Sequence, residues 1–200
     1  MRLFLCVLLL LTVFNGCQPS GELYPDAIII EEVTLIDAEL GALGAQTVII
    51  QDGKIVKIGP AAEFNLHLDN QIVNGQGKFL IPGLWDAHVH FAFIEELAPS
   101  MFDLFLVNGV TSVRDTGGRI DFLKKWKDQS LANPLSSPRV MIAGPLIDGM
   151  PNVYDGSTPF RPELSTGVVD EEAAIALVNR LDSLGVDLLK AYEMLTPTQF

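Results

Sequence analysis

The sequence predicts an α/β protein in which a small β unit precedes the first half of a parallel (β/α) barrel. Short β-branched segments joined by tight turns come first, and strand-like and helix-like segments alternate after residue 78. Four strands and three helices fit before residue 200, and strand–helix–strand repeats with right-handed crossovers build such barrels. We therefore divide the chain into a leader (residues 1–16), a linker (17–25), the β unit (26–78) and the half-barrel (79–200).

The β unit is predicted from apolar, β-branched runs. Asp52-Gly53 separates the last two runs and is typical of a hairpin turn that needs positive φ. His67, in a polar stretch without a partner at ligand spacing, is expected to be solvated. The predicted strands are Ala27 to Ile30, Val33 to Ile36, Thr47 to Ile50 and Ile55 to Ile58.

The half-barrel is predicted from the alternation that follows. A helix over Pro99 to Asn108 ends before Gly109, and a second helix over Ile120 to Gln129 carries Trp126, which we expect in the core. A third helix begins at Asp170, with acidic residues at its positive end, and ends at Gly185. The predicted strands are Phe79 to His90, Val110 to Arg114, Arg139 to Ala143 and Val186 to Tyr192.

One long connection interrupts this alternation. The segment from Gly144 to Pro159 is rich in Gly, Pro and Asp. In a barrel it would lie on the face where the strands end, which is where active sites form. We expect a loop that faces the substrate.

The N-terminus predicts export. Met1-Arg2 precedes an apolar run that is too short to span a bilayer, as in a secretory signal peptide. Cys17 follows this run directly and resembles the lipidated cysteine of a bacterial lipoprotein, so we expect a lipid-anchored protein of the cell envelope. The alternative is a plain signal peptide cut nearby, which leaves Cys17 as a free thiol.

The charge limits the partners. The formal net charge is −12, whereas nucleic acids and anionic membrane surfaces are bound by clustered Lys and Arg. We therefore expect no nucleic-acid partner, and contact with a membrane only through the lipid anchor.

The strongest chemical signal is a pair of histidines one residue apart. His88 and His90 close an apolar run, and alternate side chains of a strand lie on one face. Imidazole is a preferred ligand of zinc and similar divalent ions. The alternative is two ordinary histidines at a strand end. The spacing favours a metal clamp.

Three segments resemble the amidohydrolase superfamily, which contains metal-dependent hydrolases built on a (β/α)8 TIM barrel. Residues 82–90 (PGLWDAHVH) resemble the signature of its first barrel strand. Residues 109–118 (GVTSVRDTGG) and 188–192 (LLKAY) resemble the second and fourth strands of its imidazolonepropionase-like and Xaa-Pro dipeptidase-like branch. The resemblance implies that the β unit is a small β-sandwich domain completed by segments from after the barrel.

Lys190 lies in the predicted fourth strand, where an unpaired ammonium would carry a large desolvation cost. The resemblance implies that this lysine reacts with CO2 to form a carbamate that bridges two metal ions. Burial would favour the reaction by lowering the lysine pKa. The alternative is a lysine whose stem packs in the core while its head reaches water or pairs with Asp187 or Glu193.

Two neighbours of these candidate ligands are candidate supporting residues. Asp86 shares the face of His88 and either orients the imidazole or caps the strand. Tyr192 shares the face of Lys190 and is predicted to support the metal site or touch the substrate. Arg114 and Asp115 end the second strand, and we expect Arg114 to pair with an acid and neither residue to be catalytic.

The resemblance implies metal-dependent hydrolysis of an amide-like C–N bond in a small molecule or dipeptide. It also implies that the Asp that transfers the proton, and two further His ligands, come from later strands, beyond residue 200. We therefore expect an N-terminal fragment that is inactive alone. The alternative is a binding or scaffolding lipoprotein that keeps a half-barrel without catalysis.

Overall fold

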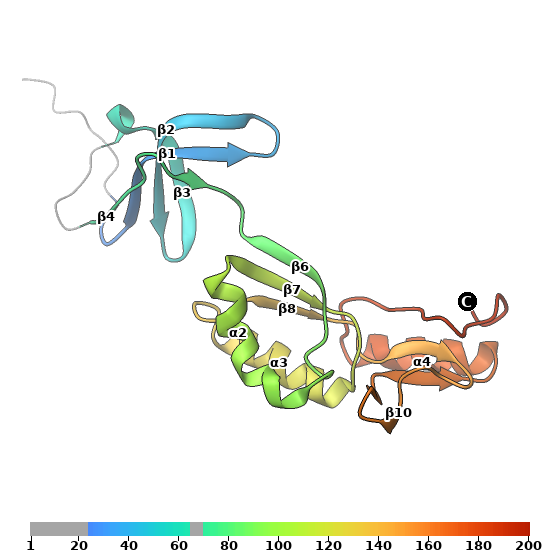
Figure 1. Ribbon diagram of the computed structural model, residues 1–200. Coiled ribbons are helices and arrows are strands. Elements are labelled where there is room, and N and C mark those ends of the chain that lie inside the picture. Colours follow the sequence, from blue (N-terminus) through green and yellow to red (C-terminus); the bar gives the residue numbers. More distant parts are fainter. Residues whose placement is uncertain (1–23, 65–69) are drawn as a thin grey trace, which may run out of the picture. The chain divides into compact units, whose positions relative to one another are not determined.

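The structure is a computed structural model that describes residues 24–64 and 70–200. The chain divides into two compact units, residues 1–82 and residues 83–200 (Figure 1). The leader, Cys17 and His67 lie outside the described residues, so those predictions stay open. Within the described ranges, no helix is long and apolar enough to cross a membrane.

The first unit is a five-stranded sheet (Figure 1). Its strands are β1 (Ile28–Asp37), β2 (Gly41–Gln51), β3 (Lys54–Pro60), β4 (Gln71–Asn74) and β5 (Phe79–Leu80), with the short 3-10 helix η1 (Ala61–Glu63) after β3. The sheet order is β3-β2-β1-β4, and β5 also pairs with β1. Asp52 and Gly53 both have positive φ, 51° and 71°, which confirms the predicted hairpin turn.

Two details of this sheet differ from the prediction. The first two predicted strands form one strand, β1, which continues through Glu31 and Glu32. It continues because the pairing register shifts after Ile30, where Glu32 has a φ of 54°. Tyr24, which we place in the linker, is buried and packs with Ala27 and Ile29. The described residues form one sheet of this unit, so the sandwich stays a prediction.

The predicted strand from Phe79 to His90 is wrong as a single element. Phe79 and Leu80 form β5, which runs parallel to β1 in the first unit, whereas β6 (Leu84–Val89) belongs to the second unit. Pro82 has no N–H for a strand ladder, and Pro82-Gly83 lies at the division between the units. The break therefore falls at the residues least able to continue a strand.

The second unit begins with the predicted β–α–β order. The parallel strands β6, β7 (Val110–Asp115) and β8 (Arg139–Ile142) are hydrogen-bonded in that order. The helices α2 (Ala98–Val107) and α3 (Ile120–Ala132) cover one face of this sheet, and the short 3-10 helix η2 (Glu95–Leu97) leads into α2 (Figure 1). The strand order supports an α/β fold of the expected kind, and closure into a barrel stays a prediction.

Aromatic side chains fill the core between this sheet and its helices. Phe91 is fully buried and stacks on Trp126 with ring centroids 6.1 Å apart, and Phe102 meets the same indole edge-on at 5.6 Å. Trp126 is therefore a core residue, as predicted. Because Phe91 follows His90 directly, this packing fixes the backbone at the end of β6.

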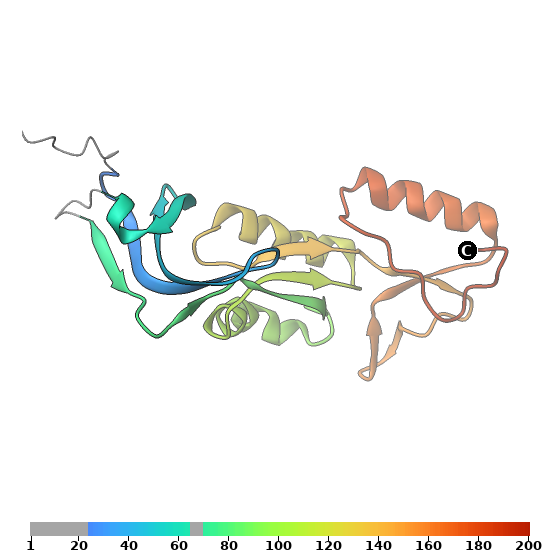
Figure 2. The ribbon, with the colours of Figure 1, turned by 90° about the horizontal axis from the view of Figure 1, so that it is seen from above.

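The remainder of the second unit is less regular (Figure 2). The predicted loop from Gly144 to Pro159 contains the strands β9 (Leu146–Gly149) and β10 (Asp155–Thr158). A hairpin joins β10 to β11 (Arg161–Glu163), and β12 (Ser165–Val168) runs parallel to β9. Helix α4 (Glu171–Ser183) begins as predicted, because the Asp170 carboxylate caps it by accepting from the Ala173 N–H.

The predicted strand from Val186 to Tyr192 is wrong. Within residues 24–64 and 70–200, its single β-bridge joins Ala191 to Ile147 of β9, and the rest of the segment has no ladder. A continuous partner strand is missing because Gly144, at a φ of 71°, and Pro145 separate β8 from β9. The segment that carries Lys190 is therefore extended but held by few backbone hydrogen bonds.

Candidate metal centre

His88 and His90 come together at the C-terminal end of β6, as the sequence predicts. Their Nε2 atoms are 3.3 Å apart, with ring centroids separated by 5.2 Å. Two nitrogens that share one tetrahedral zinc, each about 2.0–2.1 Å from the ion, lie roughly 3.3 Å apart. The two rings therefore fit two coordination positions of one ion.

Simple strand alternation does not describe how the two rings are positioned. The register between β6 and β7 shifts between Asp86 and Val89, so β6 contains one extra residue at this point. Asp86 stabilises the irregular turn, because its carboxylate accepts a hydrogen bond of 3.1 Å from the His88 backbone N–H. This contact is closer to the capping alternative than to orientation of the imidazole.

Asp115 supports His90 in a way that the sequence does not reveal. Its buried carboxylate accepts from the Phe91 N–H at 2.6 Å and the Gly117 N–H at 3.0 Å. The Gly117 carbonyl lies 3.1 Å from Nδ1 of His90, and a carbonyl can only accept. Nδ1 therefore carries the proton, and Nε2 keeps the lone pair that a metal needs. The Thr116 hydroxyl, 3.4 Å from Nε2, can donate to that lone pair when no metal is bound.

The surroundings of His90 favour its neutral form. Burial lowers the pKa of His90, and the positive charges of His88 and Lys190 lower it further. The hydrogen bond to the Gly117 carbonyl raises this pKa, but by less than burial lowers it. Metal ions bind the neutral imidazole, so a lowered pKa reduces competition from protons.

Lys190 lies near this pair but is not deeply buried. Its side chain is partly exposed, in the irregular segment described above. Asp187, one of the two acids offered as an alternative partner for Lys190, forms its ion pair with Lys127 instead, at 2.8 Å. Asp187 is therefore not the ion-pair partner of Lys190.

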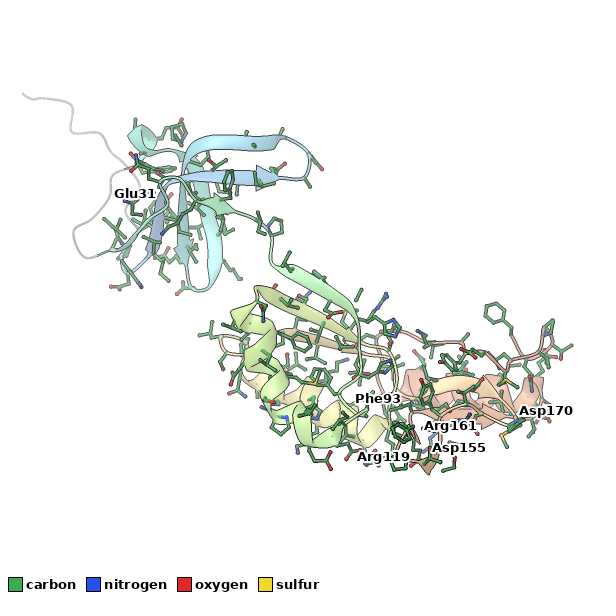
Figure 3. All side chains as sticks on the ribbon, viewed as in Figure 1. Glu31, Phe93, Arg119, Asp155, Arg161 and Asp170 are labelled. Carbon is green, nitrogen blue, oxygen red and sulfur yellow. The ribbon has the colours of Figure 1, made fainter. Side chains whose placement is uncertain are left out.

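Tyr192 lies in an aromatic group beside the site. Its ring centroid is 5.9 Å from that of Tyr154, which is 6.4 Å from that of Phe93. Figure 3 labels Phe93, in the connection that follows β6. Burial raises the pKa of the Tyr192 hydroxyl, and contacts with Tyr154 and Glu193 act in the same direction. The phenol is therefore neutral at physiological pH and available as a hydrogen-bond donor.

Other predicted residues have structural contacts. Arg114 donates from Nε to the Ala87 carbonyl at 2.8 Å, and among the described residues no acid forms the predicted ion pair with it. In the same part of the chain, no group of three His, Cys, Asp or Glu side chains gathers as a metal site. The described residues offer a divalent ion two imidazole ligands, with Lys190 near enough for its charge to affect His90.

Asp115 gives a prediction for stability. Burial raises the pKa of this carboxyl to about 7, although the Gly117 and Phe91 N–H groups oppose the shift. Because the folded chain holds this proton more tightly than the unfolded chain, the contribution of Asp115 to the free energy of unfolding should fall by up to about 4 kcal/mol as pH rises from about 4 to 7. The lowered pKa of His90 acts in the opposite direction. Denaturant unfolding of the metal-free chain across this range measures the slope. Asp115→Asn should flatten it, and an equal slope in that variant would contradict the assignment.

Parts of the chain are similar to known proteins. No protein-family model matches the chain. Imidazolonepropionase of Ectopseudomonas mendocina is 36% identical over 63 residues, which are 31% of this chain and 16% of that protein. Adenine deaminase 2 of Shouchella clausii is 34% identical over 86 residues, 42% of this chain and 15% of that protein. Dihydroorotase of Carboxydothermus hydrogenoformans is 41% identical over 64 residues, 32% of this chain and 14% of that protein.

Solved structures agree over a longer part of the chain. A putative prolidase from Bifidobacterium longum superimposes with a TM-score of 0.70 at 24% identity, covering 86% of this chain and 42% of that chain. Phenylurea hydrolase B gives a TM-score of 0.65 at 27% identity, covering 82% of this chain and 45% of that chain.

These similarities support membership of the amidohydrolase superfamily. The chain spans less than half the length of these proteins, which fits the N-terminal half that the resemblance implies.

Proposed function

We propose that this chain forms the N-terminal half of a metal-dependent hydrolase of amide-like C–N bonds. The observation that carries the proposal is the pair of Nε2 atoms of His88 and His90, 3.3 Å apart at the C-terminal end of a parallel strand. Active sites of α/β barrels lie at that end of their strands. The relatives include adenine deaminases, a dihydroorotase and prolidases, which are hydrolases that act on C–N bonds.

Each residue has a distinct role in this proposal. His88 and His90 hold a divalent ion, zinc being the natural choice for imidazole ligands. When bound, such an ion supplies a Lewis acid and activates water at neutral pH. Asp115 and the Gly117 carbonyl hold His90 with Nε2 free. Lys190 would hold metal through an anionic carbamate oxygen, and the Tyr192 hydroxyl would donate to substrate or ligand.

The substrate class follows from the relatives. Structural likeness to prolidases and sequence likeness to imidazolonepropionases support the branch that contains these enzymes. We propose a small substrate: a dipeptide, a cyclic amide or another non-peptide amide. The resemblance assigns proton transfer to an Asp outside these residues, so the 200-residue chain should be inactive alone.

A substrate panel tests this function. The protein produced from the complete gene, loaded with zinc, manganese or cobalt, is assayed for amine release from Xaa-Pro dipeptides, cyclic amides and aryl ureas. We expect hydrolysis of one class, abolished by a chelator and restored by metal. Metal-loaded, folded protein that hydrolyses none of them would overturn the proposal and favour the binding lipoprotein.

Export gives a separate prediction. We propose that Cys17 is acylated and anchors the protein in the cell envelope, because the signal peptide is removed and lipidation is the anchor that the sequence offers. Cys17→Ser should move the protein from the membrane fraction to the soluble fraction, as measured by fractionation of the native host. Cys6→Ser, inside the leader, is the matched control and should leave the distribution unchanged. Membrane retention of Cys17→Ser would contradict lipidation.

A further inference from the structure

The segment that carries Lys190 is held at its two ends by carboxylates. Two backbone–backbone hydrogen bonds join this segment to β9, both at Ile147: its N–H donates to the Lys190 carbonyl, and its carbonyl accepts from the Tyr192 N–H, each at 2.9 Å. So few backbone bonds do not fix a segment as a strand ladder does. The carboxylates of Asp187 and Asp148 add the missing contacts.

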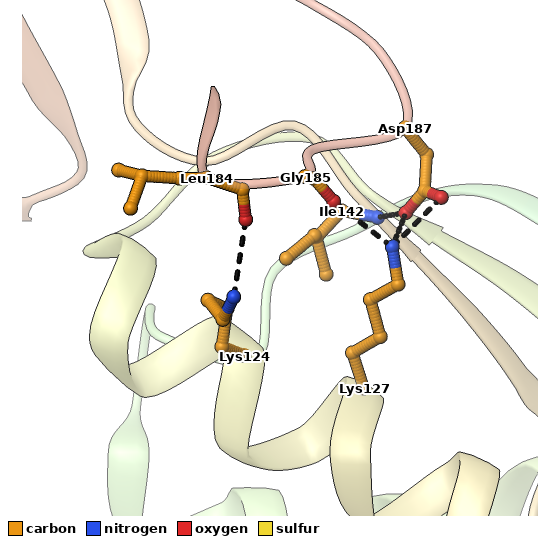
Figure 4. Close-up of polar contacts among 6 residues, drawn as sticks. All are labelled: Lys124, Lys127, Ile142, Leu184, Gly185 and Asp187. Carbon is orange, nitrogen blue, oxygen red and sulfur yellow. Dashed lines mark hydrogen bonds and ion pairs between the residues drawn. The ribbon is translucent and has the colours of Figure 1, made fainter. Parts of the chain in front are cut away.

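Asp187 fixes the start of the segment to β8 and α3 (Figure 4). Its carboxylate accepts from the Ile142 N–H at 2.9 Å and from Nζ of Lys127 at 2.8 Å to both oxygens. Lys127 also donates to the Gly185 carbonyl at 3.1 Å, and Lys124 donates to that of Leu184 at 3.1 Å. The two lysines thus connect α3 to the end of α4 and the start of the Lys190 segment.

Asp148 fixes the end of the segment. This residue is fully buried, and its Oδ1 accepts from the Met194 N–H at 2.8 Å and the Gly149 N–H at 3.0 Å. Its other oxygen accepts from the Val153 N–H at 2.8 Å. A single carboxylate therefore joins β9, the connection after it and the chain that follows Lys190.

We propose that Asp148 and the Lys127–Asp187 pair are positioning residues for Lys190, an inference that rests on the proposed role of Lys190 at the metal site. Lys190 lies three residues after Asp187 and four before Met194, so the two carboxylates bracket it. A ligand on a loosely held segment spends little time in binding geometry, and fixing its backbone raises metal affinity without adding a ligand.

We call Asp148 the first clamp and the Lys127–Asp187 pair the second, and Asp148→Asn tests the first. Every donor around Asp148 is a backbone N–H, so Asp148→Asn places an NH2 group against at least one of them. Lys127→Met tests the second clamp. Because the Lys127 side chain is partly exposed, this substitution should disturb the fold less than a change at the buried Asp148. Ser130→Ala is the control: it removes a buried hydrogen bond to the Pro138 carbonyl in the same unit, away from Lys190.

Zinc affinity, measured by competition with a chelating dye in bicarbonate buffer, is the main readout for the protein from the complete gene. Each clamp variant should raise the zinc Kd by about tenfold or more, the range typical of lost outer hydrogen bonds at metal sites. Ser130→Ala should leave the zinc Kd unchanged. Backbone amides of residues 187–194 should exchange faster in the clamp variants than in this control.

A double-mutant cycle separates the proposal that Lys190 is a metal ligand from the proposal that the two clamps position it. In a Lys190→Ala background, Asp148→Asn and Lys127→Met should add little to the zinc Kd, because the ligand they position is gone. If Lys190→Ala alone leaves the Kd unchanged, its assignment as a ligand fails. If Lys190→Ala weakens binding but the clamp variants behave like Ser130→Ala, or act equally in both backgrounds, the positioning proposal is overturned while Lys190 stands.

Discussion

Zinc binding by the 200-residue chain should be weak, and replacing His88 and His90 together by alanine should abolish it. A tight tetrahedral site needs at least three protein ligands, and the structure brings two imidazoles together, with Lys190 near them. Loss of an outer hydrogen bond at a metal site costs about 10–100-fold in affinity, so loss of a direct ligand should cost more than about 100-fold. Isothermal titration with zinc at pH 7.5 measures the change.

The third histidine supplies the control for this experiment. His67→Ala keeps both candidate ligands and should bind zinc as the unmodified chain does. Circular dichroism should show that both variants are folded like the unmodified chain, because His88 is exposed and His90 only half-buried. Tight zinc binding that survives removal of both His88 and His90 would exclude the assigned site.

Lys190→Ala should remove metal and activity together in the protein from the complete gene. If a carbamate on Lys190 bridges two ions, the variant lacks a shared anionic ligand, and metal content should fall from about two ions towards none. Acetate or propionate should partly restore both metal content and turnover, because a small carboxylate can occupy the vacated space and replace the ligand oxygens. Metal analysis and turnover with and without the acid measure the rescue.

A surface lysine distinguishes this chemistry from packing. Lys125→Ala removes an exposed ammonium 5.2 Å from the Trp126 ring centroid, and it should change neither metal content nor the response to acid. A Lys190 that only packs its stem would lose stability on substitution and gain nothing from acetate. Full activity of Lys190→Ala would end the carbamate hypothesis.

Local signals predicted the elements that the structure confirms. Asp52-Gly53 marks a turn because two successive residues there adopt positive φ. Asp170 marks the start of α4 because its carboxylate satisfies an N–H of the first helical turn. The His88–His90 spacing predicted two adjacent rings, although a bulge rather than regular alternation positions them.

Features that depend on distant segments could not be predicted. Phe79 and Leu80 are as apolar as the strand after them, and only their pairing with β1 assigns them to the first unit. Val186 to Tyr192 has the composition of a strand, but the kink between β8 and β9 removes its partner. Asp115 and Asp148 look like polar residues at strand ends, and their roles depend on which backbone N–H groups the fold brings to them.

The carboxylate clamps also bear on the order in which the second unit assembles. The bonds from Asp187 to Ile142 and Lys127 span 45 and 60 residues, whereas the bond from Phe91 to Asp115 spans 24. Doubling a loop costs only about 0.6 kcal/mol in closure entropy, so chain length alone does not set the order. The β6–β8 sheet is stabilised by a ladder and an aromatic core, while residues 187–194 gain few contacts until those two are in place. The candidate ligand at position 190 should therefore be among the last parts of this unit to dock during refolding, and the first to detach on mild destabilisation.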